Sequence, residues 1–452
     1  MKIPCNPESE NAFLQNSSSW PSLLDYGTVL RLVKKYGTPL LIGRKSLVQH
    51  RFQAIQRELP NVEIYYAVKA NSDRALLTVL HKMGAGFDVA SEGECERVRE
   101  VCGSLRNTVF SNPCKTEQAI HRAYEFGCRK FVFDCQSELE KLIQLPVDAG
   151  LHLRVAVPAG SCRVNLSQRF GAEIDQVELL GAYAALHGRV ISGIAFHVGS
   201  QATDPKDFEV AFQVASVARR LLQRCGHKIE CINFGGGFPV DYGSFDFGQY
   251  DSPQSSRMGR SVNNCPIVAF RSANERHFRG AKGDDHCPNE PKSFEKFIDD
   301  YLRKVSGYRV ELNADTSIQW MAEPGRIVVA EAVTLITSVI GVKTLAAGKP
   351  LYTIDDGVYG SFSGRYFPPD HFRFFPMGAV ETSSASNELE DVLTPSMICG
   401  PSCDGGDVLG ESQPMPSLRI GSLLQVPMMG AYTGVGASRF NGLRIARRVW
   451  IE

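Results

Sequence analysis

Eight short β-rich runs alternate with amphipathic stretches between Glu63 and Glu323, and this alternation is the strongest constraint on the fold. The runs are 63–68, 86–89, 108–111, 130–133, 151–155, 194–198, 229–234 and 319–323. The stretches between them, such as Asp73–Lys82 and Lys206–Cys225, have the apolar spacing of helices that bury one face. Eight strand–helix units predict a (β/α)8 barrel, in which chemistry gathers at the carboxyl ends of the strands.

The pattern changes after Arg326, where β-rich segments predominate at 327–342, 350–354, 421–426 and 447–451. We therefore predict three parts: residues 45–326 as the barrel, 327–452 as a C-terminal β domain of sandwich-like or barrel-like form, and 1–44 as an N-terminal segment joining that domain. Two stretches rich in small and polar residues, 243–292 and 376–395, are expected to be surface insertions without a role in chemistry.

Composition excludes several functional classes. The formal net charge is zero, so nothing indicates a nucleic-acid partner or an anionic membrane surface. No apolar run approaches the ~20 residues of a membrane-spanning helix, and the segment Met1–Trp20 lacks a secretory hydrophobic stretch. The thirteen cysteines have no metal-ligand spacing, so we expect no metal site, reduced thiols and a cytoplasmic protein.

Lys69 closes the first apolar run, in Tyr65-Tyr66-Ala67-Val68-Lys69. A lysine there is poorly solvated, and burial would lower its pKa, so that the neutral amine could form a Schiff base with an aldehyde. Alone, this residue is better explained as a lysine whose charged end reaches solvent at a strand end.

Three further motifs favour the chemical interpretation. They are Phe196–Ser200 (FHVGS), Asn233–Pro239 (NFGGGFP) and Glu323–Arg326 (EPGR), and each follows a β-rich run. Glycines after a strand expose N–H groups to an anion, while a glutamate and an arginine could serve a pyridine nitrogen and a phosphate. Each motif alone is weak evidence. Together with Lys69 they predict a pyridoxal 5′-phosphate (PLP) site.

On these residues, the sequence resembles the eukaryotic ornithine decarboxylase family, which has an alanine-racemase-like fold. The motifs YYAVKAN, FDVAS, FHVGSQ, FGGGFP, EPGR, DDGVYGSF, CGPSCDG and GAYT occur in the family's order from about Gly37 to the C-terminus. The resemblance implies that Lys69 forms the Schiff base with PLP, that His197 stacks on the ring and that Glu323 pairs with the pyridine nitrogen. The implied phosphate ligands and supporting residues are Ser200, Gly235, Gly236, Gly237, Pro324, Gly325, Arg326 and Tyr432, with Asp88 and Arg154 at the barrel mouth.

The resemblance also implies a substrate site. Asp355, Asp356 and Asp404 would bind a distal ammonium, Phe440 would line the pocket, and Cys403 would protonate Cα after CO2 leaves. A carboxylate at the ring nitrogen favours decarboxylation over racemisation, and acidic residues suit a basic substrate. Changes from the family pattern, such as Ser363 after Phe362, border this pocket.

Three functions follow as alternatives. The first is decarboxylation of L-ornithine to putrescine in polyamine biosynthesis. The second is decarboxylation of lysine or another basic amino acid in specialised metabolism. The third is an inactive regulator resembling antizyme inhibitors, which is disfavoured because the cofactor and substrate residues named above remain.

The expected partners also follow from the resemblance. It implies a head-to-tail homodimer with shared active sites, in which the loop carrying Cys403 enters the second barrel. Arg169 and Asp407 would form an ion pair across that interface. Antizyme is a further candidate partner.

Overall fold

The computed structural model describes residues 23–242, 294–312, 318–366, 372–377 and 393–452. Within these ranges no helix combines the length and the apolar character that crossing a membrane requires. The predicted insertion at 243–292 lies outside the described residues.

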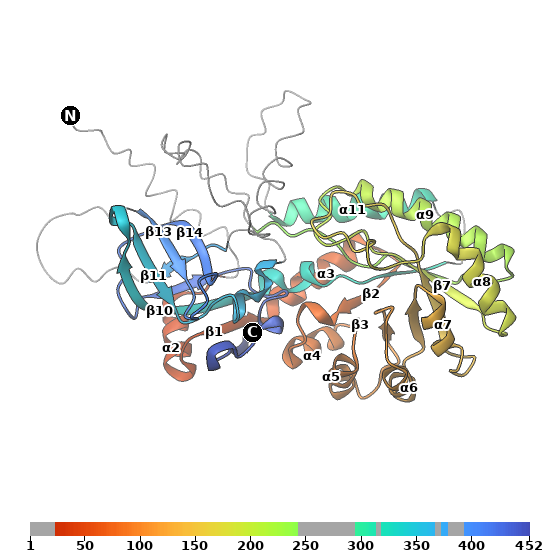
Figure 1. Ribbon diagram of the computed structural model, residues 1–452, viewed down its shortest axis with the longest axis horizontal. Helices are drawn as coiled ribbons and strands as arrows, with labels where there is room; N and C mark the ends of the chain where they lie inside the picture. Colours follow the sequence, from red (N-terminus) through yellow and green to blue (C-terminus); the bar gives the residue numbers. More distant parts are fainter. Residues whose placement is uncertain (1–22, 243–293, 313–317, 367–371, 378–392) are drawn as a thin grey trace, which may run out of the picture. The chain divides into compact units, whose positions relative to one another are not determined.

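The first part of the fold is a closed barrel of parallel strands (Figure 1). Its strands are β2 (Val62–Ala67), β3 (Gly86–Val89), β4 (Thr108–Phe110), β5 (Lys130–Phe133), β6 (Gly150–Arg154), β7 (Ile191–Ala195), β8 (Cys231–Asn233) and β9 (Gln319–Ala322). Each pairs with the next in parallel, and β9 closes the ring by pairing with β2. The predicted (β/α)8 barrel is therefore confirmed.

Helices connect successive strands of the barrel. They are α4 (Arg74–Lys82), α5 (Glu92–Cys102), α6 (Glu117–Glu125), α7 (Gln136–Leu142), α8 (Val177–Leu186), α9 (Lys206–Arg224) and α11 (Phe294–Leu312), while α3 (Lys45–Glu58) precedes β2. The starts of α4, α5 and α6 follow from local sequence, because the side chains of Asp73, Ser91 and Thr116 accept N–H groups of the first turn. At α5, Glu94 also accepts the N–H of Ala90, the residue before the N-cap, so a second N–H group at this helix start is paired.

The inside of the barrel is a packed core. Tyr65, Val109, Val132, Ala195 and Met321 come from five different strands and form one buried cluster with Cys231. Because side chains alternate along each strand, the same strands can pack this core and present polar residues at their carboxyl ends.

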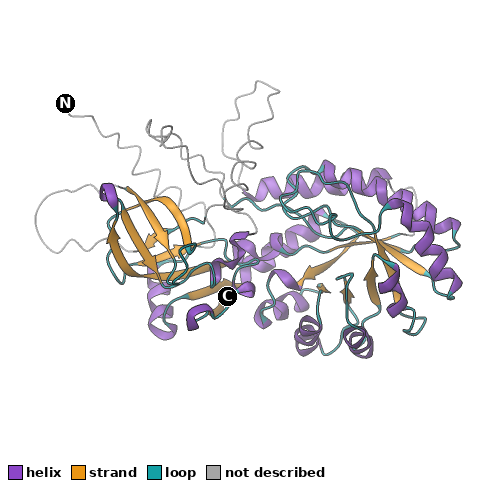
Figure 2. Cartoon of the chain, viewed as in Figure 1, coloured by secondary structure: helices purple, strands orange, loops and turns teal. Residues whose placement is uncertain are grey.

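The second part is an eight-stranded mixed sheet (Figure 2). Its strands are β1 (Leu40–Arg44), β10 (Val333–Thr344), β11 (Pro350–Ile354), β12 (Phe375–Met377), β13 (Thr394–Cys399), β14 (Val408–Met415), β15 (Leu423–Val426) and β16 (Arg447–Ile451). The order is β12-β15-β10-β11-β13-β14, and β1 pairs with both β10 and β16. Leu40 faces Ile336 across β1 and β10, so the N-terminal segment contributes a strand to this sheet. Helix α2 (Tyr26–Tyr36) packs beside it through Val29.

Two predicted strands are wrong in position or type. Strand β7 covers Ile191–Ala195, so His197 lies on the loop after the strand, not at its end. The segment from Arg326 begins with helix α12 (Arg326–Val329) and a 3-10 turn (Ala330–Ala332) before β10 starts. Both errors have one cause: a continuous buried apolar run does not reveal its own period.

Sequence analysis missed β13 and β14. Both contain proline, and Pro395 faces Pro414 across the pair. Proline usually argues against a strand, but it is tolerated where no ladder hydrogen bond is needed. The expected insertion at 376–395 is thus partly wrong, since its first residues lie in β12 and its last in β13, while 378–392 lie outside the described residues.

Candidate active site

Lys69 lies on a 3-10 turn, Val68–Ala70, directly after β2. Its Nζ donates to Oδ2 of Asp88 at 2.9 Å, and its side chain is 39% exposed. It borders a cavity of about 490 Å³, which is also lined by Val68, Ser72, Glu94, Val358, Tyr359, Ser363, Tyr432, Val435, Gly436 and Ser438. An amine at the edge of such a cavity can react with a ligand inside it.

The pKa of Lys69 differs from the sequence prediction. Burial lowers this pKa, but the charges of Asp88, Tyr432 and Glu323 outweigh burial and raise it above its ordinary value. The expected neutral amine is therefore wrong for the protein without its cofactor. A carboxylate 19 residues away in sequence supplies the counter-charge.

Asp88 is held by a residue that sequence analysis did not single out. Its carboxylate is almost completely buried, and its Oδ1 accepts a hydrogen bond from the hydroxyl of Ser111 at the end of β4. Ser111 thereby fixes the carboxylate that faces Lys69. The residue stood in a predicted strand, but a lone serine there carries no signal of this contact.

Glu323 follows β9 and is 8% exposed. Burial, and then the charge of Asp88, raise its pKa from 4.5 to about 7, against the opposing effects of Lys69, Asn233 and Arg154. Oε1 of Glu323 accepts a 2.6 Å hydrogen bond from Nδ2 of Asn233, a residue fully buried at the end of β8. Asn233 is a second residue whose contact the sequence did not predict.

The backbone of the glycine loop after β8 lies very close to neighbouring backbone segments. Gly235 and Gly237 have φ of +63° and +100°, values that favour glycine. A β-carbon at any of the three glycines would lie 2.3–2.6 Å from a backbone carbonyl oxygen. Only glycine fits at 235–237, so the backbone itself forms this wall of the site.

Arg326 lies at the start of α12 and is 6% exposed. Its guanidinium donates to the hydroxyl of Tyr242 at 2.7 Å and to that of Ser200 at 3.4 Å, and lies 4.7 Å from the ring centre of Tyr432. Ser200, Arg326 and Tyr432 thus come together as predicted. Tyr242 is an additional member, which sequence analysis missed because no motif contains it.

His197 and Arg154 complete the barrel mouth. The Nδ1 of His197 accepts the N–H of Gly199 at 2.9 Å, so a proton on the neutral ring resides on Nε2. Burial, then the cations Arg154 and Lys69, lower the pKa of His197 well below its ordinary value. The guanidinium of Arg154 lies 5.0 Å from the ring centre of Phe170. A neutral imidazole adds no positive charge beside Arg154 and Lys69.

The loop with Cys403 and Asp404 is exposed in the single chain. The hydroxyl of Tyr359 donates to Oδ2 of Asp404, and this bond, with the N–H of Gly406, lowers the pKa of Asp404. The ring of Tyr359 stacks on Phe440 with 4.2 Å between ring centres. Tyr359 borders the cavity beside Lys69, whereas Cys403, Asp404 and Phe440 do not.

The aspartates at 355 and 356 have other partners. Oδ1 of Asp355 accepts from Thr337 and from the N–H of Ser338, and Oδ1 of Asp356 accepts the N–H groups of Gly357 and Ser361. Neither aspartate lines the cavity of Lys69. Within the part of the chain that the structure describes, Oδ2 of Asp356 has no hydrogen-bond partner, and burial raises the pKa of Asp356 to about 6.

The carboxylate of Asp407 also has hydrogen-bond partners within its own chain. It is 3% exposed, and its two carboxylate oxygens accept the N–H groups of Val358 and Ser402. The guanidinium of Arg169 lies over the ring of Phe170 at 4.8 Å. An Arg169–Asp407 pair between two copies therefore stays a prediction.

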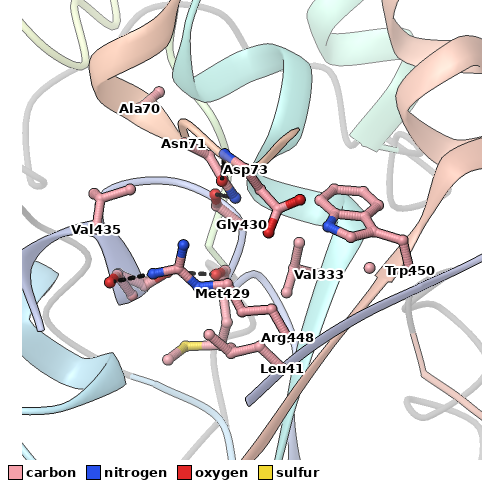
Figure 3. A pocket seen from close by; sticks show the side chains of 13 residues that line it. Leu41, Ala70, Asn71, Asp73, Val333, Met429, Gly430, Val435, Arg448 and Trp450 are labelled. Carbon is pink, nitrogen blue, oxygen red and sulfur yellow. Dashed lines mark hydrogen bonds between the residues drawn. The ribbon is translucent and has the colours of Figure 1, made fainter. Parts of the chain in front are cut away.

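A second, smaller cavity lies behind the turn of Lys69 (Figure 3). Its volume of about 10 Å³ is barely that of one water molecule, and its lining includes Asn71, Asp73 and Arg448. Beside it, Nδ2 of Asn71 donates to the carbonyl of Gly430 at 2.9 Å, and the N–H of Tyr432 donates to that of Ala70 at 2.8 Å. The loop before β16 thus clamps the turn that carries Lys69.

These residues fit PLP. An amine faces the cavity, a buried carboxylate that accepts from a neutral amide can meet the pyridine nitrogen, and a backbone wall without β-carbons and a buried arginine can hold a phosphate. The amine can react with the aldehyde of PLP, the carboxylate can pair with its pyridine nitrogen, and the backbone N–H groups and the arginine can bind its phosphate.

The comparisons with known proteins agree. Residues 45–266 match the family described as pyridoxal-dependent decarboxylase, pyridoxal binding domain. The lysine/ornithine decarboxylase of Selenomonas ruminantium is 33% identical over 430 residues, 94% of this chain and 92% of that protein. The chain belongs to the pyridoxal-dependent decarboxylases.

Two further relatives support this membership. The ornithine decarboxylase of Panagrellus redivivus is 32% identical over 426 residues, 91% of this chain and 85% of that protein. The crystal structure of the Vibrio vulnificus lysine/ornithine decarboxylase complexed with cadaverine is 27% identical, with a TM-score of 0.74 over 94% of this chain and 98% of that one. This decarboxylase therefore uses PLP and has the fold of its family.

Arg326→Ala should weaken PLP binding by about ten- to a hundredfold, because a charge-assisted hydrogen bond contributes about 1.5–3 kcal/mol. Relative rates among substrates should stay unchanged. Equilibrium titration of the cofactor-free protein with PLP measures the effect, and Arg326→Lys is the matched control that keeps the charge. An alanine variant with wild-type affinity would place the phosphate elsewhere.

Glu323→Gln should change how the stability of the cofactor-free protein depends on pH. The folded pKa of about 7 lies above the ordinary 4.5, so the folded state binds more protons than the unfolded state between these values. The free energy of unfolding should consequently fall as pH rises through this window in the wild type, and fall less in the variant. Urea unfolding at a series of pH values tests this, and curves that stay parallel would contradict it.

Proposed function

We propose that this enzyme decarboxylates a basic amino acid, with L-ornithine as its main substrate and putrescine and CO2 as products, in polyamine biosynthesis. The observation that carries the proposal is the ionised Asp404, exposed on one loop with Cys403 and bonded to Tyr359, whose ring stacks on Phe440. A fixed carboxylate beside aromatic rings is suited to an alkylammonium group. Relatives named as ornithine decarboxylases support the substrate.

Each residue of the proposed site has a separate role in the reaction. When bound, PLP supplies the electron sink for the bond that breaks. Lys69 provides the amine that holds the cofactor, and Asp88 stabilises the charged form of that amine. Glu323 keeps a proton near the pyridine nitrogen, while Ser200, Arg326 and the glycine loop hold the phosphate. The thiol of Cys403 delivers a proton to the carbon that has lost CO2.

We also propose that the working form is a homodimer with shared sites. Cys403, Asp404 and Phe440 are exposed and lie outside the cavity lining of their own chain, so a second copy can receive them. The antizyme partner stays an expectation from sequence. We propose a cytoplasmic location, which the free thiols of all described cysteines support.

The test is release of CO2 from ornithine, lysine and arginine by the protein supplied with PLP. We expect the largest kcat/KM with ornithine. A larger value with lysine would favour the second candidate, lysine decarboxylation, which the names of the Selenomonas and Vibrio proteins also support. Absence of CO2 from all three would overturn the proposal.

Asp404→Asn should raise KM for ornithine by about ten- to a hundredfold, since it removes a charge-assisted contact to the distal ammonium. Asp356→Asn is the matched control. Its amide oxygen can still accept the N–H groups of Gly357 and Ser361, so KM should change little. Steady-state kinetics of both variants decide whether the sequence prediction for Asp356 is right: an equal rise in KM would restore it as a substrate ligand.

A further inference from the structure

Three hydrogen bonds form a closed ring between Glu323, Asn233 and Gly235. Nδ2 of Asn233 donates to Oε1 of Glu323 at 2.6 Å, and Oδ1 of Asn233 accepts the N–H of Gly235 at 3.0 Å. The carbonyl of Gly235 accepts the N–H of Glu323 at 2.7 Å. Asn233 is 0% exposed, so water cannot replace any of these contacts at its side chain. The ring joins the glycine loop to the carboxylate that follows the neighbouring strand β9.

The donors and acceptors in this ring can be assigned in only one way. A backbone N–H can only donate, so the amide oxygen of Asn233 faces Gly235 and its NH2 group faces Glu323. Oε1 of Glu323 is therefore an acceptor whether the residue is ionised or not. Any proton that Glu323 carries, or shares with a ligand, is consequently on Oε2.

We propose that Asn233 is a positioning residue that dedicates Oε2 of Glu323 to the pyridine nitrogen and ties this oxygen to the loop that holds the phosphate. The inference rests on the proposed function, because it requires PLP in this site. It assigns a role to the amide of residue 233: a donor toward Glu323 and an acceptor toward Gly235 at the same time.

Aspartate at this position would be nearly isosteric but chemically opposite. It could still accept the N–H of Gly235, but its second oxygen would face Oε1 of Glu323 as one carboxylate against another. Two carboxylates at this separation repel each other, so the added carboxylate raises the proton affinity of the groups around it. Among the described residues, Lys69, Asp88, Arg154 and Cys231 interact electrostatically with Glu323, and none of them changes in this substitution.

The experiment uses PLP as the probe and needs no substrate. The dissociation constant of PLP and the pH titration of its visible absorbance are measured for wild type, Asn233→Asp and Asn233→Ala. We expect PLP to bind at least about tenfold more weakly to both variants. In Asn233→Asp the pH midpoint should move upward by about one unit or more, because an added negative charge raises the proton affinity of its neighbours.

A purely structural asparagine would lower stability without moving the midpoint. Wild-type PLP affinity and an unmoved midpoint in Asn233→Asp would therefore overturn the inference. Failure of the proposed function would be a different result: the wild-type protein would not bind PLP or would release no CO2.

Because Asn233 is buried, thermal unfolding of each cofactor-free variant is checked first. If neither variant folds, Glu323→Gln and Glu323→Leu examine the ring from its other side. Glutamine keeps an acceptor for Nδ2 of Asn233 and leucine does not. We then expect inorganic phosphate to bind several-fold more tightly to the glutamine variant, and equal affinities would overturn the inference.

Discussion

Lys69→Ala should abolish both the visible absorbance of bound PLP and all measurable release of CO2. The amine at this position is the one that faces the cavity beside Asp88, so its loss removes the covalent attachment of the cofactor. Absorbance spectra of the protein with excess PLP, followed by desalting, measure retention directly.

The matched control is Lys228→Ala. Its side chain is 83% exposed and pairs with Glu230, away from the cavity lining. The control should keep the spectrum and the activity of the wild type. If Lys69→Ala retains a wild-type spectrum after desalting, another lysine holds the cofactor and the assignment of this site is wrong.

The second large effect is recovery of activity when two inactive variants are mixed. Lys69→Ala and Cys403→Ala should each lose nearly all activity. If a second copy supplies Cys403 to the barrel that holds Lys69, a mixed dimer has one site with both lesions and one site with neither. Random reassociation makes about half of the dimers mixed, so activity should return to about a quarter of the wild-type value.

This experiment requires evidence that subunits exchange, which native mass spectrometry of differently tagged variants provides. Mixing each variant with itself is the control and should recover nothing. Confirmed exchange with activity at the level of the single variants would show that each chain completes its own site. The exposed loop of Cys403 would then need another explanation.

The sequence predicted the barrel because eight apolar runs have the period and spacing of buried parallel strands. It placed Lys69, Asp88, Gly235 and Glu323 together because the carboxyl ends of such strands meet at one rim. Ser111, Asn233 and Tyr242 escaped prediction because they act through contacts to residues 23, 90 and 84 positions away. No local pattern marks a partner at that distance.

The errors have equally local causes. The raised pKa of Lys69 depends on Asp88, so no rule about burial alone could give its sign. The assignment of Asp355 and Asp356 to the substrate stays a prediction. In the structure, Asp355 accepts from the hydroxyl of Thr337 and the N–H of Ser338, and Asp356 accepts from the N–H groups of Gly357 and Ser361. Prolines 395 and 414 concealed a strand pair that only tertiary structure reveals.

The contacts behind the turn of Lys69 have a consequence for how the chain can be divided. The predicted cofactor residues of the barrel end at Arg326, the first residue of α12, yet the turn that carries Lys69 is hydrogen-bonded to Gly430 and Tyr432 near the C-terminal end of the sequence. A fragment ending at Arg326 would keep the predicted cofactor residues of the barrel. It would lack Gly430 and Tyr432, whose hydrogen bonds fix the turn of Lys69. We therefore expect a fragment ending at Arg326 to hold Lys69 less firmly than the whole chain does.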